Sequence, residues 1–316
     1  MKPLIIYHDS CADGFGAAFC AWLKLQDKAE YSPCQYGKRQ QEFDTAMCHG
    51  RDVYILDFSF PKMIMDSIII LAKSVTWLDH HKTAFEDWVG EFHKGDCMVE
   101  EHDGLRIVLD DNQSGAMLAW KHFQPGTEVP MFIKHLDDYD RWQFQIDGTK
   151  AFQKALWSYA PWSFKQWDEF YSRESYPETE SDSLPSAFYR EGEAILRAHE
   201  ANVQSVVKNS MRKCSIIKTG PLDDGDDYIL WQKDGLAANC PPHLTSDVGN
   251  ELAKQSGTFG LCWCLDKDNQ CKVSLRSDRE HGDYDVSAIC RAFGGGGHRN
   301  AGGFVIDIQT LLNWLK

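Results

Sequence analysis

Residues 75–83 read VTWLDHHKT, an apolar run that ends in one carboxylate and two adjacent imidazoles. Neighbouring residues on a strand point to opposite faces, so His80 and His81 cannot both pack into one core. At the carboxyl end of a strand the chain leaves the sheet, and both rings can turn into a cleft, which is where open α/β sheets bind their ligands. The stretch therefore predicts a strand that delivers Asp79, His80 and His81 to a functional edge.

The first 150 residues alternate between short apolar runs and helical patterns. Three runs have the length and composition of buried strands: PLIIYH (3–8), VYILDF (53–58) and SVTWLDHH (74–81). Helical patterns lie between them, at 16–25 and 61–74, and a further helix is expected at 114–123 with Ser114 as its N-cap. Strand–helix–strand units of this length predict a parallel, doubly wound sheet.

The second half of the chain has a different pattern of apolar and polar residues. Residues 173–186 have no apolar periodicity and predict an exposed loop, whereas 190–209 has apolar residues at helical spacing. From about residue 211 the sequence alternates as strands do, in CSIIK, DYILWQ, FGLCWCL and CKVSLRS. We therefore expect an α/β protein: a doubly wound domain over 1–189, a linker helix over 190–210 and a smaller α+β domain over 211–316.

Composition limits the function classes. The chain has 316 residues, enough for two domains, and a net charge of −14, which disfavours binding to long phosphate backbones and hence to duplex DNA. A short anionic substrate needs only a local basic pocket. The 11 cysteines form no paired zinc-ribbon spacing, so we interpret them as reduced thiols of a cytoplasmic protein. The apolar stretch 63–72 is too short to span a membrane.

Acidic and imidazole groups follow all three predicted strands, at ends that share one edge of a parallel sheet. The first strand is followed by His8 and Asp13, the second by Asp57, and the third is the one quoted above. A fourth acidic group, Asp137, Asp138 and Asp140, is costly without a neighbouring positive charge. Mixed histidine and aspartate ligands suit Mn²⁺, and also Mg²⁺, Co²⁺ or Zn²⁺. A carboxylate shared by two such ions would suit phosphoryl chemistry.

A glycine-rich stretch near the C-terminus predicts a second binding element. Four glycines, 294–297, directly precede His298, and Arg276 ends the predicted strand KVSLRS. Glycines let backbone N–H groups approach an anion closely, and arginine presents a planar fork to phosphate or carboxylate. The alternative is a flexible turn with Arg276 in a surface ion pair. The order of a Walker-type phosphate loop is absent.

Together these motifs resemble the DHH phosphoesterase family, named for the Asp-His-His at 79–81, with its associated C-terminal domain marked by the Gly-Gly-Gly-His run at 295–298. The resemblance implies a phosphodiesterase with two Mn²⁺ ions and an active site in the cleft between the two domains. It implies catalytic roles for Asp79 and His81. It also implies metal ligands (His8, Asp13, Asp57, His80 and Asp138) and substrate-binding residues (Arg276, Gly295, Gly296, Gly297 and His298).

The first motif departs from the family pattern. The usual order is H-x-D-x-D-G, whereas this chain has HDSCADG at 8–14. One residue is extra, and a motif aspartate is replaced by Cys11 or Ser10. Asp9 and Cys11 are the two candidates to supply the missing ligand, and the resemblance does not choose between them.

The resemblance favours the oligoribonuclease and exonuclease-like branch, acting on short single-stranded oligonucleotides or small nucleotides. Within the family, a cyclic-dinucleotide phosphodiesterase and a 3′,5′-bisphosphate nucleotide phosphatase are the alternatives. Outside enzymology, the altered first motif leaves room for a catalytically silent nucleotide-binding or sensor protein. The sequence leaves open whether the chain forms a homodimer.

Overall fold

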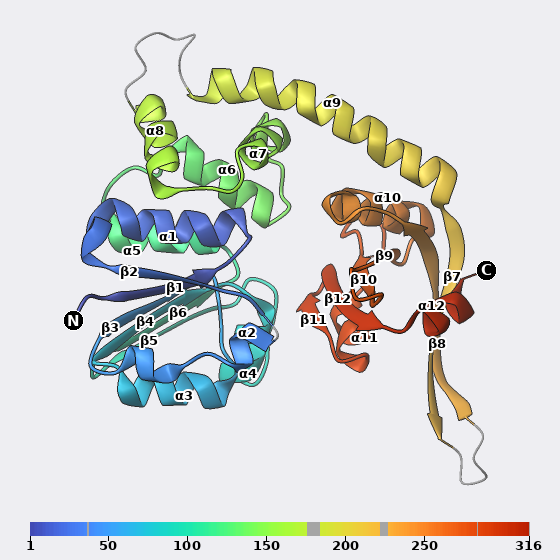
Figure 1. Ribbon diagram of the computed structural model, residues 1–316, viewed down its shortest axis with the longest axis horizontal. Coiled ribbons are helices and arrows are strands. Elements are labelled where there is room, and N and C mark those ends of the chain that lie inside the picture. Colours follow the sequence, from blue (N-terminus) through green and yellow to red (C-terminus); the bar gives the residue numbers. More distant parts are fainter. Residues whose placement is uncertain (37, 176–183, 222–226, 283, 316) are drawn as a thin grey trace. The chain divides into compact units, whose positions relative to one another are not determined.

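The computed structural model of the chain describes residues 1–36, 38–175, 184–221, 227–282 and 284–315 (Figure 1). Contacts between residues divide the chain into two compact units, residues 1–196 and 197–316. Each unit contains one six-stranded sheet in its described part. The predicted fold class, a doubly wound α/β unit followed by a smaller α+β unit, is confirmed.

The sheet of the first unit has the strand order β2-β1-β3-β4-β6-β5. All neighbouring pairs are parallel except β5 with β6, which is antiparallel. The strands are β1 (Leu4–His8), β2 (Glu30–Cys34), β3 (Asp52–Leu56), β4 (Ser74–Asp79), β5 (Cys97–His102) and β6 (Leu105–Asp110). The three predicted strands correspond to β1, β3 and β4, whereas β2, β5 and β6 were not predicted.

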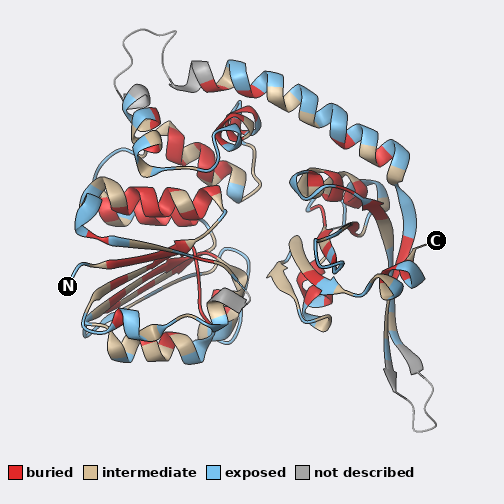
Figure 2. Cartoon of the chain, viewed as in Figure 1, coloured by how far each residue is buried: buried red, intermediate tan, exposed pale blue. Residues whose placement is uncertain are grey.

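Helices cover both faces of this sheet (Figure 1). On one face α1 (Ala12–Leu25) and α5 (Gly115–Phe123) share a buried core, and on the other face α3 (Lys62–Leu71) and α4 (Lys82–Trp88) share a second core. Figure 2 shows the central strands and α1 as largely buried. The Ser114 side chain accepts a hydrogen bond from Met117 N, so the predicted N-cap of α5 is confirmed. Short elements complete this part: α2 (Lys38–Gln41), and 3₁₀ turns at Gln26–Lys28 and Thr45–Cys48.

A layer of further helices extends the core over α1. It consists of α6 (Met131–Asp140), α7 (Thr149–Ser158) and α8 (Phe164–Ser175). Large aromatic side chains, among them Phe132, Phe152 and Trp167, are buried there beside Phe19 of α1. Burial of such side chains stabilises a fold by roughly 2–3 kcal/mol each. This layer fixes α6, which carries the three aspartates at 137, 138 and 140.

The second unit contains a mixed sheet with the order β11-β12-β10-β9-β8-β7, in which β8 and β9 alone are parallel among the described strands. Strand β10 alternates buried and more exposed residues, as the sequence pattern predicted. The strands are β7 (Arg212–Pro221), β8 (Asp227–Asn239), β9 (Gly260–Leu265), β10 (Cys271–Arg276), β11 (Gly296–His298) and β12 (Ala301–Ile306). The helices are α10 (Thr245–Ser256), α11 (Val286–Ala292) and α12 (Ile308–Trp314), with a 3₁₀ turn at Pro242–Leu244.

Residues 184–210 form one long helix, α9 (Leu184–Ser210), which contains the range predicted as a linker helix. Of the loop predicted at 173–186, residues 176–183 lie outside the described residues, and the remainder belongs to the ends of α8 and α9. Among the helices described, none combines the length and the apolar character needed to cross a bilayer.

Candidate metal centre

The carboxyl ends of β1, β3 and β4 meet at one edge of the first sheet. The pairing register places Tyr7 beside Leu56, and Leu56 beside Leu78, so the next residues along these strands, His8, Asp57 and Asp79, are level. The strand order reverses direction between β1 and β3, which makes this edge the topological switch point where open α/β sheets bind ligands. The predicted convergence of three strand ends is therefore present.

Asp57 lies at the middle of this group. Its side chain is 1% exposed, with Oδ1 at 3.1 Å from His80 Nε2 and Oδ2 at 3.5 Å from His8 Nδ1. Its backbone adopts φ 52°, a left-handed conformation that is uncommon for a residue other than glycine and that clusters at functional sites. Burial would raise the pKa of Asp57, but the imidazoles of His8 and His80 outweigh it and lower that pKa.

Asp13 and Asp140 lie close to the imidazole of His80. His80 Nε2 lies 3.8 Å from Asp13 Oδ2 and 3.3 Å from Asp140 Oδ2. Asp13 also accepts hydrogen bonds from the first two amides of α5, Gly115 N at 2.6 Å and Ala116 N at 3.0 Å. Burial and the charges of Asp57 and Asp140 raise the pKa of Asp13 well above its ordinary value, which reflects the cost of crowding buried negative charge.

The Asp140 side chain is 28% exposed, and partial desolvation within the cluster raises its pKa, although the charge of His80 opposes that effect. The nearby carboxylates also affect the imidazole of His80, whose protonated form they favour. Burial alone would lower the pKa of His80, but its hydrogen bond with Asp57 and the charges of Asp140 and Asp13 raise it well above its ordinary value. These shifts favour the protonated forms of Asp13, Asp140 and His80, and a divalent cation bound there would favour the deprotonated forms.

Asp79 positions His81. The Asp79 side chain is fully buried, and its Oδ1 accepts hydrogen bonds from His80 N at 2.8 Å and His81 N at 3.2 Å. The same oxygen lies 2.6 Å from His81 Nδ1. Burial would lower the pKa of His81, but the charge of Asp79 outweighs it and raises that pKa, which favours the protonated ring.

Cys11 joins the cluster on the side of His8. Its thiol sulfur, one His8 nitrogen and one Asp57 carboxylate oxygen all lie within 4.8 Å of one another. Burial, followed by the charges of Asp57 and Asp140, raises the pKa of the Cys11 thiol well above its ordinary value. Asp9, the other candidate left open by the sequence, is in none of the three potential ligand groups found among the described residues.

The structure places Asp138 away from this cluster. Its carboxylate accepts hydrogen bonds from Gln145 N at 2.7 Å, Ile146 N at 3.1 Å and Thr149 Oγ1 at 2.7 Å, and thereby holds the loop between α6 and α7. Asp140, which is two residues further along α6, is the aspartate grouped with Asp13 and His80. The sequence showed three candidates in this stretch, and the hydrogen bonds from the following loop distinguish them.

Two further residues at the site carried no signal in the sequence. Gly115 has no side chain where α5 meets the cluster, and a Cβ there would lie 2.3 Å from Asp57 Cβ. The ring of Tyr36, which follows β2, packs edge-on against His8 with centroids 5.0 Å apart. Neither residue belongs to a motif, since each acts by closeness to a residue far away in the sequence.

The donor atoms present fit divalent cations. Three buried polar atoms of the cluster, His8 Nδ1, Asp57 Oδ2 and Asp79 Oδ2, have no hydrogen-bond partner within the part of the chain that the structure describes. Leaving a buried polar atom unpaired costs on the order of 1–3 kcal/mol, so three together are a strong indication of a missing ligand. Imidazole nitrogen with carboxylate oxygen is a donor set that suits Mn²⁺ and related ions.

The predicted substrate-binding residues lie in the second unit. Arg276 Nη2 donates to Ser246 Oγ at 3.1 Å and Nη1 to the Leu275 carbonyl at 2.9 Å, which fixes the guanidinium. Gly296–His298 is strand β11, paired with β12, rather than a free loop.

Packing requires two glycines of the run. A Cβ on Gly295 would lie 2.0 Å from Gly303 O, and one on Gly297 would lie 2.4 Å from Ala301 O. Gly296 is different, because nothing lies within 4 Å of a Cβ built there. Close backbone packing thus explains part of the run, and the anion-binding role of its amides stays a prediction.

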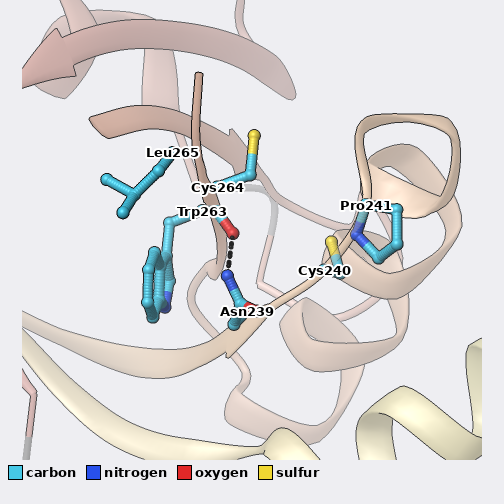
Figure 3. A pocket seen from close by; sticks show the side chains of 6 residues that line it. All are labelled: Asn239, Cys240, Pro241, Trp263, Cys264 and Leu265. Atoms are coloured by element: carbon cyan, nitrogen blue, oxygen red, sulfur yellow. Dashed lines mark hydrogen bonds between the residues drawn. The ribbon is translucent and has the colours of Figure 1, made fainter. Parts of the chain in front are cut away.

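A pocket in the second unit lies apart from these residues in the sequence. It is lined by Asn239, Cys240, Pro241, Trp263, Cys264 and Leu265 (Figure 3). Asn239 Nδ2 donates to the Trp263 carbonyl at 2.9 Å across its wall. The lining contains no cluster of charged groups, so we assign it no role in the chemistry.

The fold and the site define a class: a doubly wound α/β unit that carries a buried histidine and aspartate centre at its topological switch point. No family model matches the chain. It is 29% identical over 319 residues to the uncharacterized protein R106 of Acanthamoeba polyphaga mimivirus, covering 96% of this chain and 67% of that protein. Among solved structures, a pGpG-specific phosphodiesterase, PggH from Vibrio cholerae, aligns over 99% of this chain and 96% of its own, with a TM-score of 0.48 and 12% identity.

Proposed function

We propose that this chain is a metal-dependent phosphodiesterase of the DHH type that hydrolyses short oligonucleotides or small nucleotides with two divalent cations. The observation that carries the proposal is the position of Asp57. One of its carboxylate oxygens faces His80 and the other faces His8, at 3.1 and 3.5 Å, so a single buried carboxylate is shared by two groups of donor atoms. A carboxylate that bridges two cations is the arrangement used for two-metal phosphoryl chemistry.

We propose that Asp140, rather than Asp138, completes the ligand set around His80. The set would be Asp13, Asp57, His80 and Asp140 for one cation, and His8 and Asp57 with a further donor for the other. When bound, two Mn²⁺ ions, or Mg²⁺ or Co²⁺ in their place, supply an activated water and stabilise the leaving oxygen. The chain's own part is to hold these ligands in position before the substrate arrives.

His81 is our candidate for the contact to the scissile phosphate. The 2.6 Å contact with Asp79 orients the ring, and the charge of Asp79 raises the pKa of His81, which favours the protonated ring. A protonated imidazole can donate a charge-assisted hydrogen bond to a phosphate oxygen. Asp79 then acts as a positioning residue, because it is buried beneath His81.

Substrate recognition is proposed for Arg276, His298 and the amides around Gly296. The net charge of −14 supports short substrates, because long single strands are bound through many basic contacts along the backbone. A fixed guanidinium can bind one terminal phosphate without an extended basic surface.

The test begins with protein stripped by chelator and reloaded with Mn²⁺. Four substrates are followed in parallel: a labelled dinucleotide, a five-residue RNA, a cyclic dinucleotide and a 3′,5′-bisphosphate nucleotide. We expect Mn²⁺-dependent cleavage of at least one of them. That cleavage should be lost in Asp57→Asn but kept in Asp66→Asn, which changes a half-exposed aspartate of α3. If all four stay intact while one still binds, the chain is a nucleotide-binding protein and not an enzyme.

A further inference from the structure

Cys11 is the N-cap residue of α1, but its side chain does not cap the helix. Its backbone is extended, with φ −128° and ψ 133°, and its side chain makes no capping hydrogen bond. Its carbonyl accepts from Phe15 N at 3.0 Å, which is the backbone part of a helix start. The preferred N-cap residues are serine, threonine, aspartate and asparagine. Helix capping therefore does not explain a cysteine here.

The thiol of Cys11 lies close to donor atoms of His8 and Asp57. Cys11 Sγ lies within 4.8 Å of donor atoms of His8 and Asp57, and Asp57 is 1% exposed. Asp57 Oδ2 and His8 Nδ1 are buried atoms that face each other at 3.5 Å and make no hydrogen bond within the described residues. This second observation does not depend on the cysteine. Nitrogen, oxygen and sulfur donors thus converge on one position.

The two positions around Asp57 differ in their chemistry. Around His80 the nearby donors are carboxylates (Asp13 and Asp140 in one group, Asp57 and Asp79 in another) and the imidazole of His81. Around His8 the donor besides Asp57 is a thiol. Carboxylate oxygens suit hard ions such as Mg²⁺ and Mn²⁺, and thiolates select softer ones such as Zn²⁺. The two positions should therefore not prefer the same metal.

We propose that Cys11 is a thiolate ligand, so that the His8, Cys11 and Asp57 position takes a thiophilic cation while the Asp13, His80 and Asp140 position takes a harder one. The inference rests on the proposed two-cation centre and specifies its metals. On binding, the S–H bond of Cys11 breaks, a sulfur–metal bond forms and the proton passes to solvent. No group changes oxidation state.

Cobalt(II) reports thiolate ligation without any need for turnover. Metal-free protein, kept reduced and anaerobic, is titrated with Co²⁺ and followed by absorption. We expect visible d–d bands together with a near-ultraviolet thiolate-to-cobalt charge-transfer band. Cys11→Ser should lose the charge-transfer band, and Cys11→Asp should keep the d–d bands without it. Both variants are first checked for a wild-type thermal unfolding transition.

Cys240→Ser is the matched control for thiols elsewhere in the chain. Cys240 and Cys262 both contact Thr245, at 3.8 Å from its hydroxyl and 3.5 Å from its carbonyl respectively, so they are a second place where thiols gather. The proposal requires Cys240→Ser to keep the charge-transfer band. In competition between Zn²⁺ and Mn²⁺, Cys11→Asp should lower the preference for Zn²⁺ by roughly 10- to 100-fold, the range seen when support of a metal ligand is removed.

The Co²⁺ titration distinguishes failure of the thiolate-ligand proposal from failure of the proposed function. Cobalt binding with d–d bands, but with the same near-ultraviolet spectrum in wild type and Cys11→Ser, would overturn the thiolate ligand and leave the two-cation centre standing. If Co²⁺ does not bind at all, the centre itself is wrong, and the proposed function and the thiolate ligand are overturned together.

Discussion

Replacing Gly115 with alanine should disable the metal centre from a residue that bears no ligand. A Cβ at Gly115 would lie 2.3 Å from Asp57 Cβ and 2.8 Å from Asp57 Cγ and Oδ1. Carbon atoms in contact ordinarily stay about 3.5–4.0 Å apart, so one of the two residues must move by roughly 1 Å. The start of α5 cannot move freely, because Gly115 N donates a hydrogen bond to Asp13 at 2.6 Å. The strand side resists as well, because Asp57 N donates to the Leu78 carbonyl at 2.9 Å.

The expected loss follows from that displacement. A misplacement of about 1 Å in a catalytic group costs on the order of 100-fold in rate, which corresponds to about 2.7 kcal/mol of transition-state stabilisation. Overpacking should also destabilise the fold by about 1–3 kcal/mol. The measurements are kcat/KM on the substrate identified above, Mn²⁺ affinity by calorimetry and urea-induced unfolding.

The control variant Gly126→Ala distinguishes a loss of fold stability from a loss of the metal centre. Nothing lies within 4 Å of a Cβ at Gly126, but its φ is +78°, so alanine there should cost about 1–2 kcal/mol of stability without touching the site. We expect Gly126→Ala to keep its kcat/KM and Mn²⁺ affinity while Gly115→Ala loses both. A Gly115→Ala protein with unchanged metal affinity and rate would refute the assignment of Asp57 to the centre.

Three further outcomes are expected. Asp140→Asn should weaken Mn²⁺ binding by roughly tenfold or more. Asp138→Asn should keep its Mn²⁺ affinity but lose about 2 kcal/mol of folding stability, because its hydrogen bonds to the following loop are weakened. The reverse pattern would restore Asp138 as the ligand. Burial lowers the pKa of His135 to about 4, below the value of about 6.5 in an unfolded chain. The unfolded state therefore binds the proton first as the pH falls. The free energy of unfolding should decrease by up to about 3 kcal/mol between pH of roughly 6.5 and 4. His135→Asn should flatten that part of the unfolding free energy against pH, and an unchanged slope would show that His135 is not its source. Arg276→Ala should raise KM with little change in kcat if the side chain binds substrate uniformly, and an unchanged KM would move recognition elsewhere.

The sequence predicts the inner strands β1, β3 and β4, but it misses the two edge strands and the inner strand β6. Strands β1, β3 and β4 are buried on both faces, so each appears as a continuous apolar run. Strand β2 reads EYSPC and β5 reads CMVEEH, and most of their side chains are half-buried or exposed. An edge strand that buries little leaves little hydrophobic pattern, and a proline within it removes the remaining signal.

The candidate site is predictable where it follows from strand ends. His8, Asp57 and Asp79 each come directly at or after an apolar run, and parallel pairing makes such positions level without further information. The choice within residues 137–140 is of another kind. It depends on the loop at 145–149, which folds back and occupies the Asp138 carboxylate, and no local pattern reports that contact.

Cys11 illustrates a third case. The spacing of the first motif shows that a ligand is missing, and both Asp9 and Cys11 stand near the gap. In the structure Ser10 adopts φ 55°, and Cys11, the residue before α1, lies with its sulfur near donor atoms of His8 and Asp57. This backbone conformation brings Cys11 to the cluster, which the sequence alone does not report, and the role of Cys11 as a ligand stays a proposal.

Anomalous diffraction at the manganese absorption edge, from crystals of the reduced protein grown with Mn²⁺, tests the two-cation centre most directly. We predict two peaks that flank the Asp57 carboxylate, one beside His8 and one beside His80, and no such pair in Asp57→Asn. A single peak that does not contact Asp57, or an Asp57→Asn protein that retains both peaks, would contradict the shared carboxylate on which the proposed function rests.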